Sequence, residues 1–220
     1  MTQRPFHRDI DELVGRVVKM ADTCRVAVHE GVESFVNLDQ DRARNVIALN
    51  KQVNEMDVDI EMRTLNLIAL HQPMAVDLRV LGAIMKIITY LDRIGRYGYD
   101  CAKATLAMEG KAHIKRLVGI PIMRDKALGL LDRAIQAFRT RDEKLAGTVE
   151  QADDEVDALY EECLRECVTY MIEDPRTISQ CTHYILVARH IERIGDNAVK
   201  IAEKTIYATT GKNRLQTKVA

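Results

Sequence analysis

The stretch LDRIGRYGYDCAKAT at residues 91–105 recurs one hundred residues later as IERIGDNAVKIAEKT at residues 191–205. In the second copy, apolar residues return every three or four positions, which is the period of an amphipathic helix. Five pairs of residues are identical in this register: Arg93/Arg193, Ile94/Ile194, Gly95/Gly195, Ala102/Ala202 and Thr105/Thr205. An internal repeat of this length predicts two copies of one helical unit.

Helix breakers are few, and they divide each copy into three helices. Pro73 and Pro175 each suit the first turn of a new helix. Asp39 or Asp41, and Asp142 in the second copy, are suitable N-caps because their carboxylates accept hydrogen bonds from free backbone N–H groups. The expected helices span residues 8–36, 42–71, 74–108, 117–140, 143–172 and 176–208.

We therefore predict an all-α chain of two tandem three-helix bundles, related by a repeat of about 100 residues. Short connections make neighbouring helices antiparallel. A 30-residue helix is about 45 Å long, so the molecule should be elongated. The first repeat is expected at residues 1–112, the second at 113–210, and a solvated tail at 211–220.

Composition narrows the functional classes. The 220 residues are 47% apolar and 30% charged, which is typical of a soluble globular protein. A net charge of −1 gives no electrostatic reason to expect nucleic acid. No window is apolar enough for a membrane span, and the N-terminus lacks a secretory signal. Five cysteines, an odd number, favour a reduced, cytoplasmic location.

The strongest candidates for a binding site are carboxylates at helical spacing. Asp153, Asp157 and Glu161 each follow an apolar residue by one position, which rotates them about 100° from the apolar stripe of the fifth helix. Glu192 and Asp196 form a similar pair on the sixth helix. Packed helices lie about 8–10 Å apart, so these carboxylates could share a groove and bind a hard cation.

The second pair also surrounds a glycine. An interior glycine costs a helix about 1 kcal/mol against alanine. Gly195 would be explained if another helix or a ligand approaches beside Asp196.

The first repeat offers a reduced version of this pattern. Asp57, Glu61 and Asp92 match Asp157, Glu161 and Glu192 at the same offset of one hundred residues. Arg96 replaces the last acid, and a guanidinium cannot bind a metal ion. Asp100, one turn further along, is the possible substitute.

Other interpretations stay open at this point. Acids at helical spacing often form only a solvated face, so a helical scaffold without metal is one alternative. A carboxylate-bridged metalloenzyme is another, although the Glu-x-x-His motif of di-iron bundles and a nucleophile–base pattern are both missing. His183 and His190 could supply nitrogen ligands or respond to pH, but partly buried structural histidines explain them as well.

Four motifs in order resemble those of the PhoU family. They are QPMAVDLR at 72–79, LDRIG at 91–95, YMIEDPRTI at 170–178 and IERIGDNAVKIAE at 191–203. The resemblance covers nearly the whole chain. It implies a cytoplasmic, helical, often dimeric protein that is not an enzyme.

Such a protein would link the ATPase subunit of a phosphate ABC transporter to a sensor histidine kinase, restraining phosphate uptake and the starvation response. The resemblance also implies metal on E/D-x-x-x-D motifs, with iron or zinc foremost and magnesium or manganese as alternatives. The matching ligands here are Asp57 with Glu61, Asp153 with Asp157 and Glu161, and Glu192 with Asp196.

Overall fold

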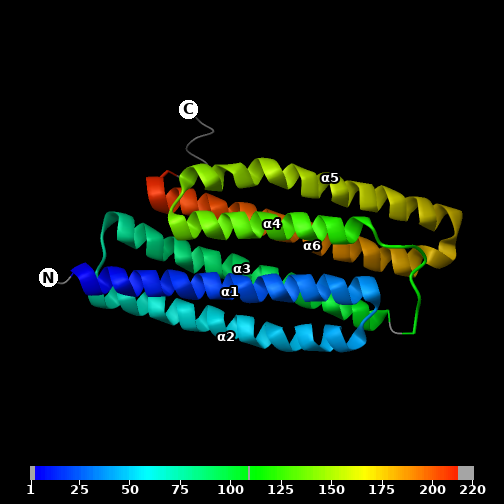
Figure 1. The fold of residues 1–220 in the computed structure, drawn as a ribbon, viewed down its shortest axis with the longest axis horizontal. Helices are drawn as coiled ribbons and strands as arrows, with labels where there is room; N and C mark the ends of the chain where they lie inside the picture. The colour runs from blue at the N-terminus through cyan, green and yellow to red at the C-terminus, as the bar shows by residue number, and fades with distance from the viewer. Residues whose placement is uncertain (1–2, 109, 213–220) are drawn as a thin grey trace.

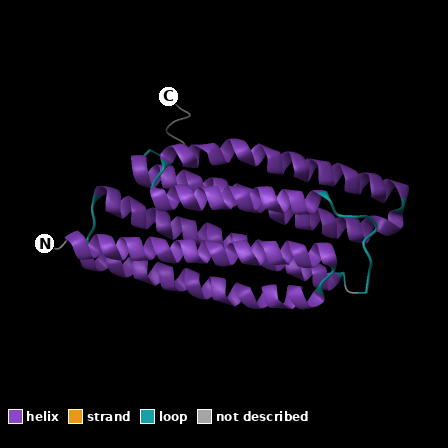
Figure 2. Ribbon diagram, viewed as in Figure 1, coloured by secondary structure: helices purple, strands orange, loops and turns teal. Residues whose placement is uncertain are grey.

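The computed structural model describes residues 3–108 and 110–212, and every regular element in these ranges is helical (Figures 1 and 2). No helix within them is both long and apolar enough to cross a membrane. The first half contains α1 (Gln3–Asn37), α2 (Gln40–His71) and α3 (Ala75–Ala107). The second contains α4 (Gly119–Thr140), α5 (Glu143–Glu173), the short 3-10 helix η1 (Pro175–Thr177) and α6 (Ile178–Thr210). The prediction of two elongated three-helix bundles is confirmed.

The helix boundaries follow the capping residues. The Asp39 carboxylate accepts a hydrogen bond of 2.9 Å from the backbone N–H of Arg42, and Asp142 caps α5 in the same way. α1 begins five residues earlier than expected, because Pro5 is tolerated in a first turn that needs no N–H donor. Most of the expected C-terminal tail, residues 213–220, lies outside the described residues.

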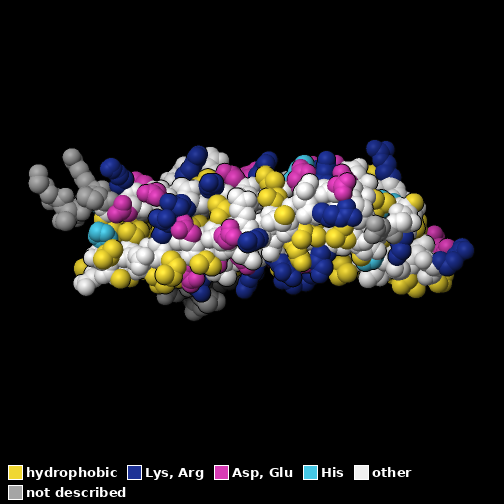
Figure 3. Space-filling model, turned by 90° about the horizontal axis from the view of Figure 1, so that it is seen from below, with side chains coloured by type: hydrophobic (Ala, Val, Ile, Leu, Met, Phe, Trp, Pro, Cys, Tyr) yellow, Lys and Arg dark blue, Asp and Glu magenta, His cyan; other side chains and the backbone are white. Residues whose placement is uncertain are grey.

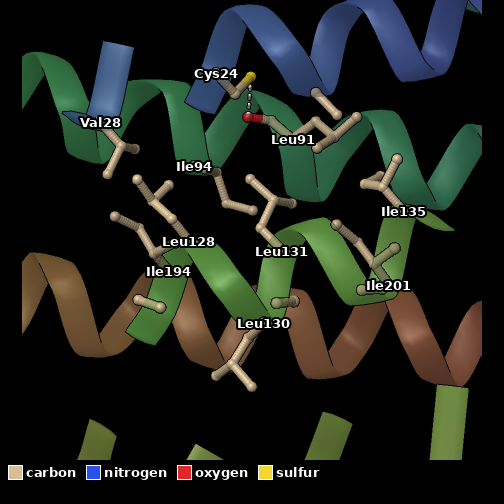
Figure 4. Packing of buried hydrophobic residues seen from close by; sticks show 14 of the residues in the cluster. Cys24, Val28, Leu91, Ile94, Leu128, Leu130, Leu131, Ile135, Ile194 and Ile201 are labelled. Atoms are coloured by element: carbon tan, nitrogen blue, oxygen red, sulfur yellow. Dashed lines mark hydrogen bonds between the residues drawn. The ribbon is translucent and has the colours of Figure 1, made fainter. Parts of the chain in front are cut away.

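One hydrophobic core runs through both halves. α3 packs along α6 and α1 packs against α4, so four helices meet at the centre of the molecule (Figure 1). Figure 4 shows this junction, where Val28, Ile94, Leu128, Leu131 and Ile194 fill the space between the helices. Because the core is shared, α2 and α5 lie on opposite outer sides of one continuous framework.

Polar contacts also join the halves. His113, in the segment between α3 and α4, lies 3.0 Å from the carbonyl oxygen of Phe35 and 3.1 Å from the Tyr184 hydroxyl. The buried guanidinium of Arg124 on α4 donates to Glu33 on α1 at 2.7 Å. These contacts fix the connecting segment and the α1–α4 packing.

Candidate metal centre

Four carboxylates gather between α5 and α6. Asp153 and Asp157 lie one turn apart on α5, and Glu192 and Asp196 lie one turn apart on α6. Each pair sits beside buried residues of its own helix, Val156 on α5 for example, so packing of the apolar faces brings the flanking acids together. We call these four residues the α5–α6 acidic cluster.

Gly195 makes the close approach possible. A methyl group at this position would overlap Asp153 Oδ1, so the Asp153 carboxylate occupies the space that a side chain would take. The expectation that another helix approaches beside Asp196 is met, with Asp153 as the group that enters. This contact accounts for an interior glycine that otherwise weakens the helix.

The cluster is only partly neutralised. Arg189 donates to Glu192 at 3.1 Å, and Arg193 lies 3.4 Å from Asp196. Asp153 forms no ion pair with any described residue, and its buried Oδ1 accepts no hydrogen bond from them. Glu192 Oε2 is also buried and accepts no hydrogen bond from the described residues, although Arg193 Nε lies 3.6 Å away.

This excess of negative charge shifts the proton affinities. The pKa of Asp153 is raised to about 7, first because the carboxyl is buried and then because it faces other acids, namely Asp157, Asp196, Glu192 and Asp154. Burial is also the main reason that the pKa values of Asp157 and Glu192 are raised. A bound cation would offset this concentration of negative charge and favour the ionised form of Asp153, Asp157 and Glu192.

The four carboxylates are suitable ligands for a hard cation, but their side chains must move to bind it. Carboxylate oxygens are the ligands that such cations prefer, and two buried oxygens here accept no hydrogen bond from the described residues. Within residues 3–108 and 110–212, however, no three His, Cys, Asp or Glu side chains already converge to hold an ion. Glu161, also predicted as a ligand, lies on the exposed edge beside Arg165, at 4.0 Å.

The first half brings together three of its four predicted ligands. The pKa of Asp57 is raised by burial and by the charges of Asp92 and Glu61, so these three are neighbours. With its amide nitrogen turned toward α3, Asn54 donates to Asp92 Oδ1 at 3.0 Å. We call Asp57, Glu61 and Asp92 the α2–α3 acidic cluster.

Asp100 stands apart from that cluster. It pairs with Arg96 at 3.6 Å, and its charge acts on His190 of α6. The place that Asp153 takes in the second half is filled by Val53, which is fully buried against Gly95. The first half therefore lacks counterparts of both Asp153 and Asp196.

The histidines lie away from the acidic clusters. His190 stacks on Tyr97 of α3 with ring centroids 5.7 Å apart, and burial lowers its pKa. Burial likewise lowers the pKa of His183. Neither histidine belongs to a group of three potential metal ligands in the described part of the chain. Sequence reasoning did not single out Val53 and Asn54, although the hundred-residue offset already aligns them with Asp153 and Asp154.

Comparison with known proteins agrees with the fold and the repeat. The PhoU domain model matches residues 17–105 and again 120–205. A phosphate-specific transport system accessory protein PhoU homolog of Rhizobium meliloti is 34% identical over 207 residues, 94% of this chain and 87% of the relative. The homolog of Clostridium acetobutylicum is 32% identical and is covered to 97%, against 96% of this chain.

Solved structures give the same result. The crystal structure of PhoU from Pseudomonas aeruginosa superposes with a TM-score of 0.89 at 32% identity, covering 94% of this chain and all of that one. The PhoU regulatory protein from Streptococcus pneumoniae, at 24% identity, shares the fold with a TM-score of 0.87. The repeated domain, the full-length relatives and the shared architecture show that this chain belongs to the PhoU family of phosphate-transport accessory proteins.

Proposed function

We propose that this chain is a non-enzymatic regulator of phosphate homeostasis that binds metal on its α5–α6 acidic cluster. In this role it restrains phosphate uptake and the phosphate-starvation response in the cytoplasm. It does so by contacting the ATPase subunit of a phosphate ABC transporter and a sensor histidine kinase. Self-association into a homodimer is part of the same proposal.

The regulatory role is supported by the names of the relatives, which describe accessory proteins of a phosphate-specific transport system. The shape of the chain suits an adaptor, because its long helices expose extended side faces on one continuous core (Figure 1). A rigid framework of this kind can hold two partners at a fixed separation.

The observation that carries the metal proposal is the buried Oδ1 of Asp153, which has neither a hydrogen bond nor an ion pair among the described residues. It lies among clustered carboxylates, one of which, Glu192, has a buried Oε2 that accepts no hydrogen bond from these residues. Asp153, Asp157, Glu192 and Asp196 would hold the ion. Its positive charge would neutralise the cluster and tie α5 to α6. A metal that binds only the folded chain at 100 times its Kd adds about 2.7 kcal/mol of stability.

Metal analysis tests the site directly. Protein prepared without chelator and exposed to Fe²⁺ or Zn²⁺ should retain metal after desalting, as measured by plasma mass spectrometry. Asp157→Asn combined with Asp196→Asn should lose most of it. The matched control removes two exposed acids elsewhere, Asp41→Asn and Asp132→Asn, and should retain the metal. Equal metal content in all three proteins would contradict the proposal.

The regulatory role needs a separate measurement. In cells that lack the chain, a reporter of phosphate starvation should be active even in high phosphate, and the wild-type chain should silence it. Co-purification with the transporter ATPase subunit and with the kinase tests the contacts. A reporter that stays silent without the chain would overturn the role, whatever the metal content.

A further inference from the structure

α2 carries a second apolar stripe on its outer face. Val58, Met62, Leu65 and Ala69 follow one another at spacings of four, three and four residues, which is the heptad pattern of a helix–helix seam. The first three side chains are 58%, 55% and 47% exposed. Figure 3 looks onto the side where α2 lies, and shows hydrophobic side chains gathered between charged ones. We call these four residues the outer seam.

The fold does not require this seam. α2 already packs against α1 and α3 through a different face, which includes the buried Val53, Ile60 and Thr64. At the positions equivalent to the outer seam, α5 has Ala158, Glu162, Arg165 and Thr169. The second half thus builds the same framework without an apolar stripe at these four positions. A contiguous exposed apolar stripe on a helix that is already packed is typical of an interaction surface.

The side of the seam that borders α3 is negatively charged. Asp57 and Glu61 lie there, and neither forms an ion pair with any residue in the described ranges. On the other side, the charges are internally paired, since Arg63 bonds Asp59 at 2.9 Å. A helix lying along the seam would meet unbalanced negative charge on one flank only.

We propose that the outer seam of α2 docks one amphipathic helix of a partner protein, with apolar residues at heptad spacing and lysine or arginine along one flank. The apolar residues of that helix pack between Val58, Met62 and Leu65, and its basic flank pairs with Asp57 and Glu61. The surface lies on the opposite side of the molecule from the α5–α6 acidic cluster and works without metal.

Charge favours such a partner over a second copy of this chain. In an antiparallel two-fold pair of α2 helices, each flank lies beside the same flank of the other copy. The Asp57 and Glu61 carboxylates of both copies would then face one another, and like charges across an interface oppose binding. A basic helix removes this repulsion.

Binding of a designed helical peptide tests the proposal. The probe has 21 residues, leucine at the heptad a and d positions, and lysine along one flank. It is labelled for fluorescence anisotropy and used in the presence of EDTA. The wild-type chain should bind it more tightly than the same peptide with glutamate for lysine, and should not bind a scrambled peptide.

Variants locate the site. Met62→Glu with Leu65→Arg installs the residues of the second half, so the helix should fold, and affinity should fall at least about tenfold because the seam is lost. The matched control, Val168→Glu with Ile172→Arg on the exposed face of α5, should change affinity less than about twofold. Asp57→Asn with Glu61→Gln should weaken binding about two- to fivefold, as expected for two exposed ion pairs.

Three results would overturn the proposal. The seam variant could bind the basic peptide as well as the wild type does. The lysine and glutamate peptides could bind equally, which would show that the basic flank does not contribute to binding. Sedimentation could also show a dimer that the seam variant converts to a monomer, with peptide bound only by the monomer, and a second copy would then be the occupant. Met62→Ala with Leu65→Ala repeats each measurement if the first variant fails to fold.

Discussion

The two halves of the chain share one framework but differ at the positions that border their acidic clusters. Asp153 approaches Gly195 in the second half, whereas the apolar Val53 approaches Gly95 in the first. Asp196 belongs to the second cluster, whereas Arg96 stands at the matching position of the first. The repeat therefore preserves the helices and the glycine, while two substitutions decide how much negative charge is gathered.

A second difference concerns how closely the helices approach. A Cβ at Gly98 of α3 would lie 2.6 Å from the carbonyl carbon of Ala27 on α1, so the two backbones are in contact there. The equivalent residue of α6 is Ala198, which is fully buried. Only the first half thus needs glycine at this position, and this contrast can be tested.

The largest expected effect comes from Gly98→Val. The new side chain would meet the backbone of α1, which cannot move aside as a flexible side chain can. We expect the free energy of unfolding to fall by about 3 kcal/mol, measured by urea denaturation. The control is Ala198→Gly, which should cost about 1 kcal/mol through helix propensity. Equal losses in both variants would mean that the α1–α3 contact is not specially close.

The framework was predictable from the sequence because it depends on local signals. The apolar period, the caps at Asp39 and Asp142, and the proline positions together define six helices. Helical spacing identified the acids of the α5–α6 acidic cluster, and the hundred-residue offset then pointed to Asp57, Glu61 and Asp92 in the first half. These signals lie within a few turns of one helix, or in the alignment of one repeat with the other.

The composition of each site was less predictable, because it depends on contacts between helices. Asp153 enters the space beside Gly195 because of the way α5 is rotated about its axis relative to α6. The sequence pattern does not define this rotation closely enough to predict the contact. By its spacing alone, Asp100 is predicted to replace the missing acid. In the structure it faces Arg96 and His190, since one turn along α3 changes which neighbour it meets.

The next prediction converts the first half into the second. Val53→Asp combined with Arg96→Asp would place acids where the second half has Asp153 and Asp196. Without metal, the buried carboxylate should lower the free energy of unfolding by about 2–3 kcal/mol. With Fe²⁺ or Zn²⁺, the variant should hold more metal per chain than the wild type and recover part of this loss. Calorimetric titration measures both the stoichiometry and the affinity.

The matched control is Val58→Asp with Arg93→Asp, which adds two acids and removes one arginine on exposed positions of the same helices. It should leave the metal content unchanged. If it binds as much extra metal as the Val53 variant, then negative charge alone would explain binding and the position beside Gly95 would be irrelevant.

The smallest effect is a change in pH dependence on Asp153→Asn. The folded pKa of Asp153 is about 7, above the 3.8 of a free aspartate side chain, so the folded chain holds this proton over a pH range in which the unfolded chain has released it. Stability of the metal-free wild type should therefore be unaffected by this group below about pH 4, should decline as pH rises, and should reach its full penalty above about pH 7. Solvent screening of a half-buried group limits the penalty to about 1–2 kcal/mol.

Asparagine has nearly the same shape and no charge, so in EDTA the variant should be more stable than the wild type at pH 8 and equal to it near pH 4, measured by urea denaturation. Saturating metal should reverse the order at pH 8, because only the wild type retains the full set of carboxylates. A variant that is no more stable than the wild type in EDTA at pH 8 would show that the Asp153 charge is already compensated.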